Sequence, residues 1–303
     1  MRVSYTGGYF VRLPDGHPFP MGKFPALHRI LLQEGLIRHE DVVPAVEASW
    51  GDLGLVHTAE YLAKLERGTL SYKEERRMGL PWSEWLVRRS RIAVQGTINA
   101  VRMALEDGVA ASLGGGTHHA FPDHGEGFCV LNDVAVAIRV LQASGDLGRA
   151  LVVDLDVHQG NGTAAIFEGD ENVYTFSMHG ERNYPFHRQR STRDVDVPDG
   201  ATDEVYLALL HEHLPGVLSE ADPAFIFYLA GVDPVRGDRF GRLNLSREGL
   251  HARERYVLQA IRESGCPAVL LLSGGYAATP EITADLHAVV HREAARIFNH
   301  QTG

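Results

Sequence analysis

The chain carries, at residues 150–162, the stretch ALVVDLDVHQGNG. An apolar run leads into alternating aspartates and a histidine, and a glycine-rich turn follows. Burying carboxylates at the end of an apolar strand is unfavourable unless they bind a cation or accept strong hydrogen bonds. Positions i and i+2 of an extended chain point to the same side, so Asp156 and His158 can reach one ion together. An oxygen and a nitrogen ligand suit zinc, and the stretch therefore predicts a buried strand that ends in a metal site.

Short apolar runs alternate with longer helical patterns along the chain, which is typical of a mostly parallel sheet covered by helices. The apolar runs predict strands over 109–113, 150–155, 173–177, 224–230 and 268–272. The helical patterns cover 91–106, 132–143, 202–219, 247–264 and 281–298. Residues 66–90 combine glycines, a proline and glutamates, and we expect them to form a surface loop. Since no repeat or linker is visible, we predict one α/β domain over residues 1–303.

Polar motifs follow four of the predicted strands. They are GGGTHH at 114–119, the 154–161 segment, GVD at 231–233 and SGGY at 273–276. Ligands of open α/β sheets bind outside the carboxyl ends of the strands, so one site is expected at this edge. Asp233 would complete a metal site with Asp156 and His158 and leave one position open, as in catalytic zinc sites. Zinc polarises a carbonyl and lowers the pKa of water, which implies hydrolysis.

Two further motifs supply side chains for the chemistry. The side chains of His118 and His119 diverge, which suits proton transfer better than shared zinc binding. Tyr276 can donate a hydrogen bond to a developing oxyanion. We assign structural roles to the other conspicuous histidines, at positions 28, 57, 179, 187, 211, 213 and 291. His57 and Tyr61, four residues apart, are expected to share one helical face.

Composition restricts the partners and the compartment. The formal net charge of -10, with no basic run, argues against nucleic acid as a partner. The sequence has no apolar run of transmembrane length and no signal peptide, so no membrane partner is expected. Two cysteines, Cys129 and Cys266, form no disulfide framework and favour a reducing cytoplasm. The oligomeric state stays open.

Five motifs, taken in order, resemble the zinc-dependent histone deacetylase family. They are GGTHHA at 115–120, GEGFCVLND at 125–133, DLDVHQGNG at 154–162, GVD at 231–233 and GGY at 274–276. The resemblance spans about residues 1–290 and is greatest to the class IV-like branch and its bacterial relatives. It implies the arginase/deacetylase fold, with a central eight-stranded parallel sheet and helices on both faces. The implied activity is hydrolysis of an N-acyl-lysine amide, either acetyl or a longer acyl.

The resemblance also implies roles for the site residues. Zinc would lie on Asp156, His158 and Asp233. His118, oriented by Asp154, would stay protonated, and His119 would activate the attacking water and then protonate the leaving amine. Tyr276 would stabilise the oxyanion. Asn161 stands where class I members carry Asp, and a neutral amide raises the pKa of His119 less than a carboxylate would, so we expect a neutral His119.

Potassium and a substrate tunnel are implied as well. Potassium would lie near Asp154, Asp156, His158, Ser177 and Met178, and a second ion near Phe167, Asp170 and Val173. The tunnel would involve Gly127, Phe128, Tyr184, Phe240 and Gly275. Phe240 replaces the Glu of relatives that hydrolyse acetylpolyamines, which disfavours polyamines here. Lys23 would line an acetate exit channel, and no counterpart of the rim Asp of some members can be placed in 66–90.

Alternatives to a lysine deacylase remain. They are an amidohydrolase for a small acylated metabolite and a catalytically silent acyl-lysine binding module. An arginase-type enzyme is disfavoured because the second Asp that a two-manganese site needs after Asp233 is missing. Acyl chain length, and zinc against ferrous iron, are left undecided by the sequence.

Overall fold

The computed structural model describes residues 1–298 and contains one eight-stranded, all-parallel sheet. The strands follow the order β2-β1-β3-β8-β7-β4-β5-β6 across the sheet. Their bounds are β1 Val3–Ser4, β2 Val42–Val43, β3 Val109–Ser112, β4 Ala150–Asp154, β5 Val173–Gly180, β6 Arg193–Val197, β7 Phe225–Leu229 and β8 Ala268–Leu271. The predicted fold class, α/β with a central eight-stranded parallel sheet, is confirmed. One domain over residues 1–303 stays a prediction, because residues 299–303 lie outside the described part of the chain.

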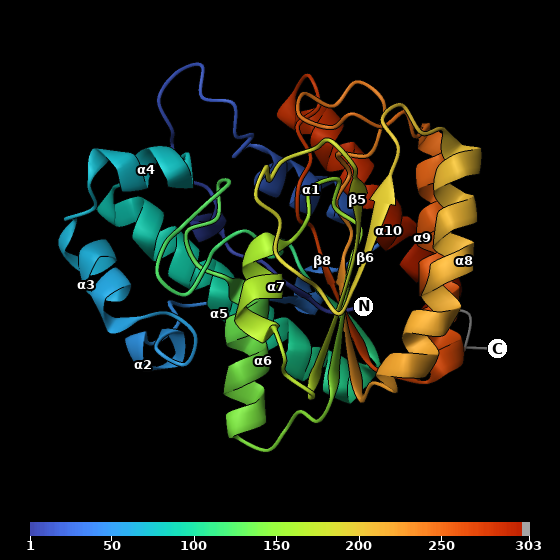
Figure 1. Ribbon diagram of the computed structural model, residues 1–303, viewed down its shortest axis with the longest axis horizontal. Coiled ribbons are helices and arrows are strands. Elements are labelled where there is room, and N and C mark those ends of the chain that lie inside the picture. The colour runs from blue at the N-terminus through green and yellow to red at the C-terminus, as the bar shows by residue number, and fades with distance from the viewer. Residues whose placement is uncertain (299–303) are drawn as a thin grey trace.

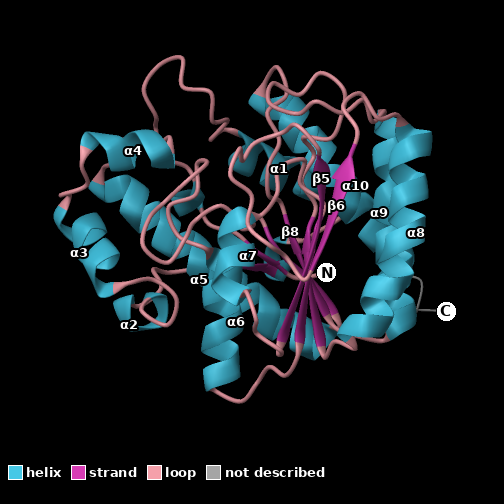
Figure 2. Ribbon diagram, in the orientation of Figure 1, coloured by secondary structure: helices cyan, strands magenta, loops and turns pink. Residues whose placement is uncertain are grey.

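Helices cover both faces of this sheet (Figures 1 and 2). In Figure 1, α6 and α7 lie on one side of the strands and α8 and α9 on the other. The helices are α1 Lys23–Gln33, α2 Trp50–Leu53, α3 Ala59–Arg67, α4 Tyr72–Met78, α5 Glu84–Asp107, α6 Asp133–Ala143, α7 Asn161–Phe167, α8 Asp203–Ala221, α9 Arg247–Ser264 and α10 Pro280–Phe298. Two short 3-10 helices, Gly7–Tyr9 and His39–Asp41, complete the described elements.

Burial explains which strands the sequence predicted. Every residue of β3, β4, β5, β7 and β8 is buried, so each of these strands has an apolar run. The strands that were not predicted are short or lie at an edge. β1 and β2 have two residues each, and β6, at the other edge, alternates charged exposed residues with buried valines. Such segments give too little apolar signal for prediction.

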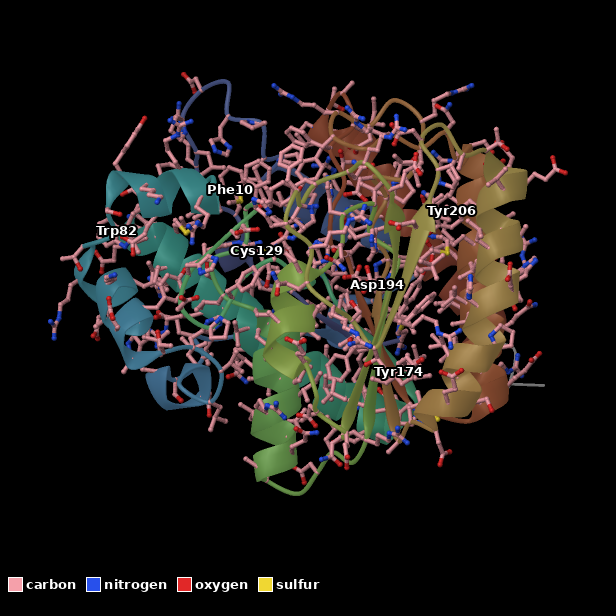
Figure 3. All side chains as sticks on the ribbon, in the orientation of Figure 1. Phe10, Trp82, Cys129, Tyr174, Asp194 and Tyr206 are labelled. Carbon is pink, nitrogen blue, oxygen red and sulfur yellow. The ribbon has the colours of Figure 1, made fainter. Side chains whose placement is uncertain are left out.

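The expectation of a surface loop over 66–90 is wrong. This segment contains α4 and the beginning of α5, and Ser71 starts α4 with a capping box in which Glu74 bonds back to the Ser71 backbone. Trp82 fixes the connection to α5, because its Nε1 donates to the carbonyl of Leu65 at 2.9 Å (Figure 3). A helix as short and polar as α4 shows little apolar periodicity, so its caps were the only signal.

His57 also departs from its prediction. It lies before α3, so it does not share a helical face with Tyr61. Its buried ring instead links two loops, with Nδ1 3.0 Å from the Phe121 carbonyl and Nε2 accepting from the Asn132 backbone at 3.1 Å.

Two findings bear on the predicted environment of the chain. Cys129, labelled in Figure 3, and Cys266 are both free thiols. Among residues 1–298, no helix combines the length and the apolar character that a membrane span requires.

Candidate metal centre and active site

The candidate site lies at the carboxyl ends of four adjacent strands, β3, β8, β7 and β4. The GGGTHH loop follows β3, the Asp156 to His158 segment follows β4, Asp233 follows β7, and the SGGY segment follows β8. Because neighbouring parallel strands end at one edge, segments more than 100 residues apart in sequence come together there.

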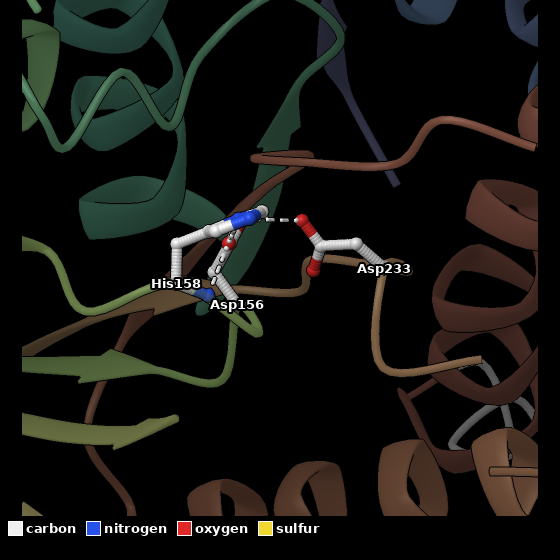
Figure 4. Close-up of side chains that lie close together, drawn as sticks. All are labelled: Asp156, His158 and Asp233. Carbon is white, nitrogen blue, oxygen red and sulfur yellow. Dashed lines mark hydrogen bonds and ion pairs between the residues drawn. The ribbon is translucent and has the colours of Figure 1, made fainter. Parts of the chain in front are cut away.

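Asp156, His158 and Asp233 converge on one point (Figure 4). One potential ligand atom from each residue lies within 4.8 Å of the other two, and all three side chains are buried. The Nδ1 atom of His158 lies 3.0 Å from Oδ1 of Asp156 and 3.2 Å from Oδ2 of Asp233. Within residues 1–298, this is the one such group of three or more histidine, cysteine or acidic side chains.

The donor set of this group fits a metal cation. Oδ1 of Asp233 accepts from the Val157 backbone at 2.8 Å, but within the described residues the buried Oδ2 of Asp233 accepts no regular hydrogen bond and has only the 3.2 Å contact with His158. A Cβ atom at Gly274 would collide with Asp233 and Asp156, so glycine keeps this space open. Burial, together with the charge of Asp156, raises the pKa of Asp233 to about 7. Two carboxylates buried this close carry an excess of negative charge that a divalent ion relieves.

His118 forms a buried pair with Asp154. Its Nδ1 lies 2.6 Å from Oδ2 of Asp154. Burial alone would lower the pKa of His118, but the charges of Asp154 and Asp156 outweigh burial and raise it to about 9. The geometry therefore favours a charged imidazolium next to the candidate metal site.

His119 stands in a different environment. Its Nδ1 lies 2.7 Å from the carboxamide oxygen of Asn161, a neutral acceptor. Burial, reinforced by the charges of His118 and His158, lowers the pKa of His119 well below its usual value. The two adjacent histidines thus differ in charge: His118 is favoured as an imidazolium and His119 as a neutral imidazole, which is the state that the sequence analysis expected for His119.

Glu126 is a functional candidate to which sequence reasoning gave no role. The carboxamide nitrogen of Asn161 donates to Oε1 of Glu126 at 2.7 Å. Burial raises the pKa of Glu126, but hydrogen bonds from His124, Tyr184 and Asn161 outweigh it and lower the pKa to about 2. The ionised carboxylate therefore orients the amide that faces His119. In the sequence, the position of Glu126 inside the glycine-rich GEGFC motif was the feature that could have indicated this role.

Two other charged residues hold the loops of the site in place. The carboxylate of Asp133 accepts from the backbone of Gly116 and Thr117, which positions the loop that carries His118 and His119. Arg253 of α9 donates to the Leu155 carbonyl at 3.2 Å and to the Gly231 carbonyl at 2.8 Å. Leu155 directly precedes Asp156, so Arg253 supports both metal-site loops. Neither role was visible in the sequence, since each depends on long-range contacts.

An aromatic tunnel leads to the site. It is a cavity of about 310 Å³ whose wall includes Phe128, Tyr184, Phe240, Tyr276 and Gly127, with His119 and His158 also exposed to it. The rings of Phe240 and Tyr276 meet edge to face with centroids 4.9 Å apart. Gly275, in contrast, lines neither this cavity nor the inner one described next.

A smaller cavity of about 40 Å³ lies on the inner side of the site. Tyr276 lines both cavities, which places its side chain where they adjoin. Lys23 also lines the inner cavity, and its Nζ donates to the Ser273 carbonyl at 2.9 Å. Burial lowers the pKa of Lys23 to about 8.

The residues of the expected potassium sites are only partly brought together. Asp154 and Ser177 are register neighbours on β4 and β5, with Met178 next along the strand. The Ser177 hydroxyl lies 2.9 Å from Nδ1 of His179. Phe167 and Asp170 of the second expected site line a surface cavity of about 470 Å³. Both potassium sites stay predictions.

A family profile and a named relative indicate one family. The profile of the histone deacetylase domain matches residues 17–292. An uncharacterized protein of Picosynechococcus sp. is 45% identical over 296 residues, which cover 98% of this chain and 99% of that protein. Histone deacetylase 2 of Arabidopsis thaliana is 33% identical over 286 residues, covering 90% of this chain and 74% of that protein. The crystal structure of the HDA15 HD domain superposes with a TM-score of 0.77 at 24% identity, covering 99% of this chain and 94% of that one, and shows the shared fold.

Proposed function

The chain belongs to the histone deacetylase family, a family of deacetylases, and from this premise we propose that it is a zinc-dependent hydrolase of N-acyl-lysine amides. The observation that carries this proposal is the meeting of three elements at one edge of the sheet. They are a buried Asp-His-Asp group, a neutral histidine beside it, and a tunnel with an aromatic wall. A tunnel of this kind suits an extended alkyl stem that ends in an amide.

Asp156, His158 and Asp233 would hold the zinc ion. When bound, zinc supplies a Lewis acid that polarises the substrate carbonyl and lowers the pKa of water. Carboxylate oxygens and an imidazole nitrogen are both ligands of this ion, and three protein ligands leave a position open. Potassium near Asp154 and Ser177 is part of the same proposal, as is a cytoplasmic location.

His119 would move the proton during hydrolysis. The Asn161 oxygen accepts from Nδ1–H of His119, so the lone pair is on Nε2. Nε2 takes a proton from the attacking water as the new C–O bond forms. It then returns that proton to the leaving amine as the C–N bond breaks, which yields a carboxylic acid and an amine. The acid then gives up its proton to the amine, so the final products are a carboxylate and an ammonium group.

Tyr276 and His118 would stabilise the charges of the reaction. The Tyr276 hydroxyl can donate to the oxyanion that develops on the substrate carbonyl. Burial raises the pKa of Tyr276 well above its usual value, so the hydroxyl keeps its proton. The charged His118, held by Asp154, adds a favourable field without taking part in proton transfer.

Hydrolysis of a lysine-peptide panel, from acetyl to myristoyl, tests the proposal with zinc-loaded protein and N-acetylputrescine alongside. We expect Tyr276→Phe to lower kcat by about 10²–10³, the usual effect of removing one oxyanion donor. Tyr174→Phe is the matched control, because that hydroxyl donates to Glu220 at 2.8 Å, away from the site. Near-normal turnover by Tyr276→Phe contradicts the proposed role. Inactivity on every peptide, with zinc bound, favours a small acylated metabolite or a silent binding module.

A further inference from the structure

The mouth of the tunnel carries unpaired positive charge. Among the residues that line the 310 Å³ cavity, Arg76 and Arg77 are the only permanently charged ones. Both belong to the last turn of α4 and are exposed to solvent. A third arginine, Arg239, lies with its guanidinium carbon 5.6 Å from the centroid of the Phe240 ring, which is part of the same wall.

The backbone holds these two arginines beside the tunnel wall. The carbonyl of Arg77 accepts from the Gly127 backbone at 3.3 Å, and the carbonyl of Met78 accepts from the Phe128 backbone at 2.8 Å. Gly79 ends α4 with a φ of 75°, and a Cβ atom there would press on the Phe128 ring at 3.0 Å. The end of α4 is therefore bound to the segment that forms the wall, and its charges have a defined place.

Neither arginine of the mouth is held in a direct ion pair among residues 1–298. Neither Arg76 nor Arg77 forms an ion pair within the described part of the chain, although the protein as a whole has a formal charge of -10. The acidic neighbour Glu74 forms an ion pair with Lys64 at 3.0 Å and accepts a hydrogen bond from the Ser71 backbone. Arg76 contacts the ring of Tyr72 instead.

The field of Arg77 reaches the tunnel wall. Burial and the charge of Glu126 raise the pKa of Tyr184 well above its usual value, and the charge of Arg77 opposes both. An anionic group of a substrate would be attracted by this field at the exposed mouth, whereas the Glu126 carboxylate opposes negative charge near Tyr184.

We propose that this arginine mouth, Arg76 and Arg77, selects acylated lysines that carry a carboxylate next to the acylated side chain. The inference rests on the proposed function and adds the charge of the substrate to it. The carboxylate has two sources with the same chemistry, an acidic neighbour in a peptide or the α-carboxylate of free Nε-acetyl-lysine. Cationic acylamines are repelled by the same charges.

The kinetic test compares acetyl-lysine peptides whose neighbours are Glu, Gln or Lys, with free Nε-acetyl-lysine and its α-amide as a second pair. We expect kcat/KM to be roughly 3- to 10-fold higher for the Glu peptide than for the Gln peptide, the size of two exposed charge pairs. The Lys peptide should be slower than the Gln peptide. Raising the salt to about 1 M, where the Debye length is about 3 Å, should remove most of the difference.

Charge reversal assigns the effect to these residues. The double variant Arg76→Glu/Arg77→Glu should reverse the preference, and Arg76→Gln/Arg77→Gln, a milder change, should abolish it. Lys73→Glu is the matched control, because Lys73 is an exposed cation of α4 that does not line the tunnel. It should leave the preference within about 2-fold of its original value.

Direct binding separates this inference from the proposed reaction. The Kd of each labelled peptide for the Tyr276→Phe variant should follow the same charge order as kcat/KM. Equal Kd values for Glu and Lys peptides overturn the arginine mouth, even if hydrolysis is efficient. Charge-ordered binding without hydrolysis by wild-type protein supports the arginine mouth and contradicts the hydrolase. A preference confined to free Nε-acetyl-lysine identifies the α-carboxylate as the recognised group, and one confined to peptides identifies the acidic neighbour.

Discussion

The carboxamide of Asn161 bridges His119 and Glu126, with its oxygen 2.7 Å from Nδ1 of His119 and its nitrogen 2.7 Å from Oε1 of Glu126. An amide that donates to a carboxylate on one side must present its oxygen on the other. His119 consequently keeps its proton on Nδ1, and the Nε2 lone pair is left for the substrate side.

We predict that Glu126→Ala lowers kcat by about 10- to 100-fold, because the Asn161 amide can then rotate and offer a donor to His119. The effect on KM should be smaller than that on kcat, since Glu126 itself does not line the tunnel and touches it through Tyr184. Glu126→Gln, which retains an acceptor oxygen, should restore much of the rate. Steady-state kinetics of the three proteins test this, and an Ala variant as fast as wild type contradicts the positioning role.

Metal removal should destabilise the protein. Within the described residues, Oδ2 of Asp233 is buried and has only an ion-pair contact, with Nδ1 of His158 at 3.2 Å, and the neighbouring carboxylate of Asp156 repels it. A bound ion at a concentration about 1,000 times its Kd adds about 4 kcal/mol to the free energy of unfolding. Thermal unfolding should therefore show a lower Tm after chelation and recovery with one equivalent of zinc. Asp233→Asn should lose the zinc-dependent rise in Tm, and a rise equal to that of wild type contradicts the ligand assignment.

Arg253 should be essential for stability. It is fully buried, and its charge is balanced by Glu254 at 2.5 Å, which also accepts from the hydroxyl of Tyr228. Arg253→Met leaves the Glu254 charge buried without its partner, and we expect a loss of about 3–5 kcal/mol in the free energy of unfolding.

The double variant Arg253→Met/Glu254→Leu should recover part of that loss, since no unpaired charge remains. Urea unfolding of the wild type, both single variants and the double variant forms a complete cycle. Strictly additive losses contradict a coupling between Arg253 and Glu254.

Acid should destabilise the protein through His57. Burial lowers the pKa of His57 from 6.5 to about 4, and its Nε2 can accept from Asn132 only while neutral. The unfolded state binds a proton near pH 6.5 and the folded state only near pH 4, so stability falls as pH falls through this window. The slope from one such group is at most about 1.4 kcal/mol per pH unit.

Thermal unfolding between pH 7 and pH 4.5 measures this effect. His57→Gln should lower Tm at pH 7 and flatten its decline toward acid. His211→Gln, at an exposed histidine of α8, should keep the slope of the wild type. Identical slopes in all three proteins contradict the linkage to His57.

Local patterns in the sequence predicted the central strands of the sheet and one pair of metal-site residues, Asp156 and His158. Strands buried on both faces have continuous apolar runs, and this is why the runs near 109, 150, 173, 224 and 268 could be recognised. The alternation of Asp156 and His158 predicted a shared ion, because a strand fixes the direction of side chains two residues apart.

Relationships between distant segments could not be predicted in this way. Sequence spacing does not reveal that Glu126 meets Asn161, or that α4 ends against Phe128. The two-residue strands β1 and β2 depend on pairing with their neighbours and have no pattern of their own. The apolar runs predicted five strands, and only the resemblance of five motifs to a family predicted that the sheet has eight.

The sequence by itself determined which residues can bind a metal and move a proton, because ligand type and strand periodicity are local properties. The family resemblance already implied different charge states for His118 and His119, but only the tertiary structure supplied the contacts and the burial behind them, with Asp154 beside one ring and Asn161 beside the other. The tertiary structure also placed Arg76 and Arg77 at the tunnel mouth. Burial and electrostatic fields depend on every element packed around a group, and they exist only once the chain has folded.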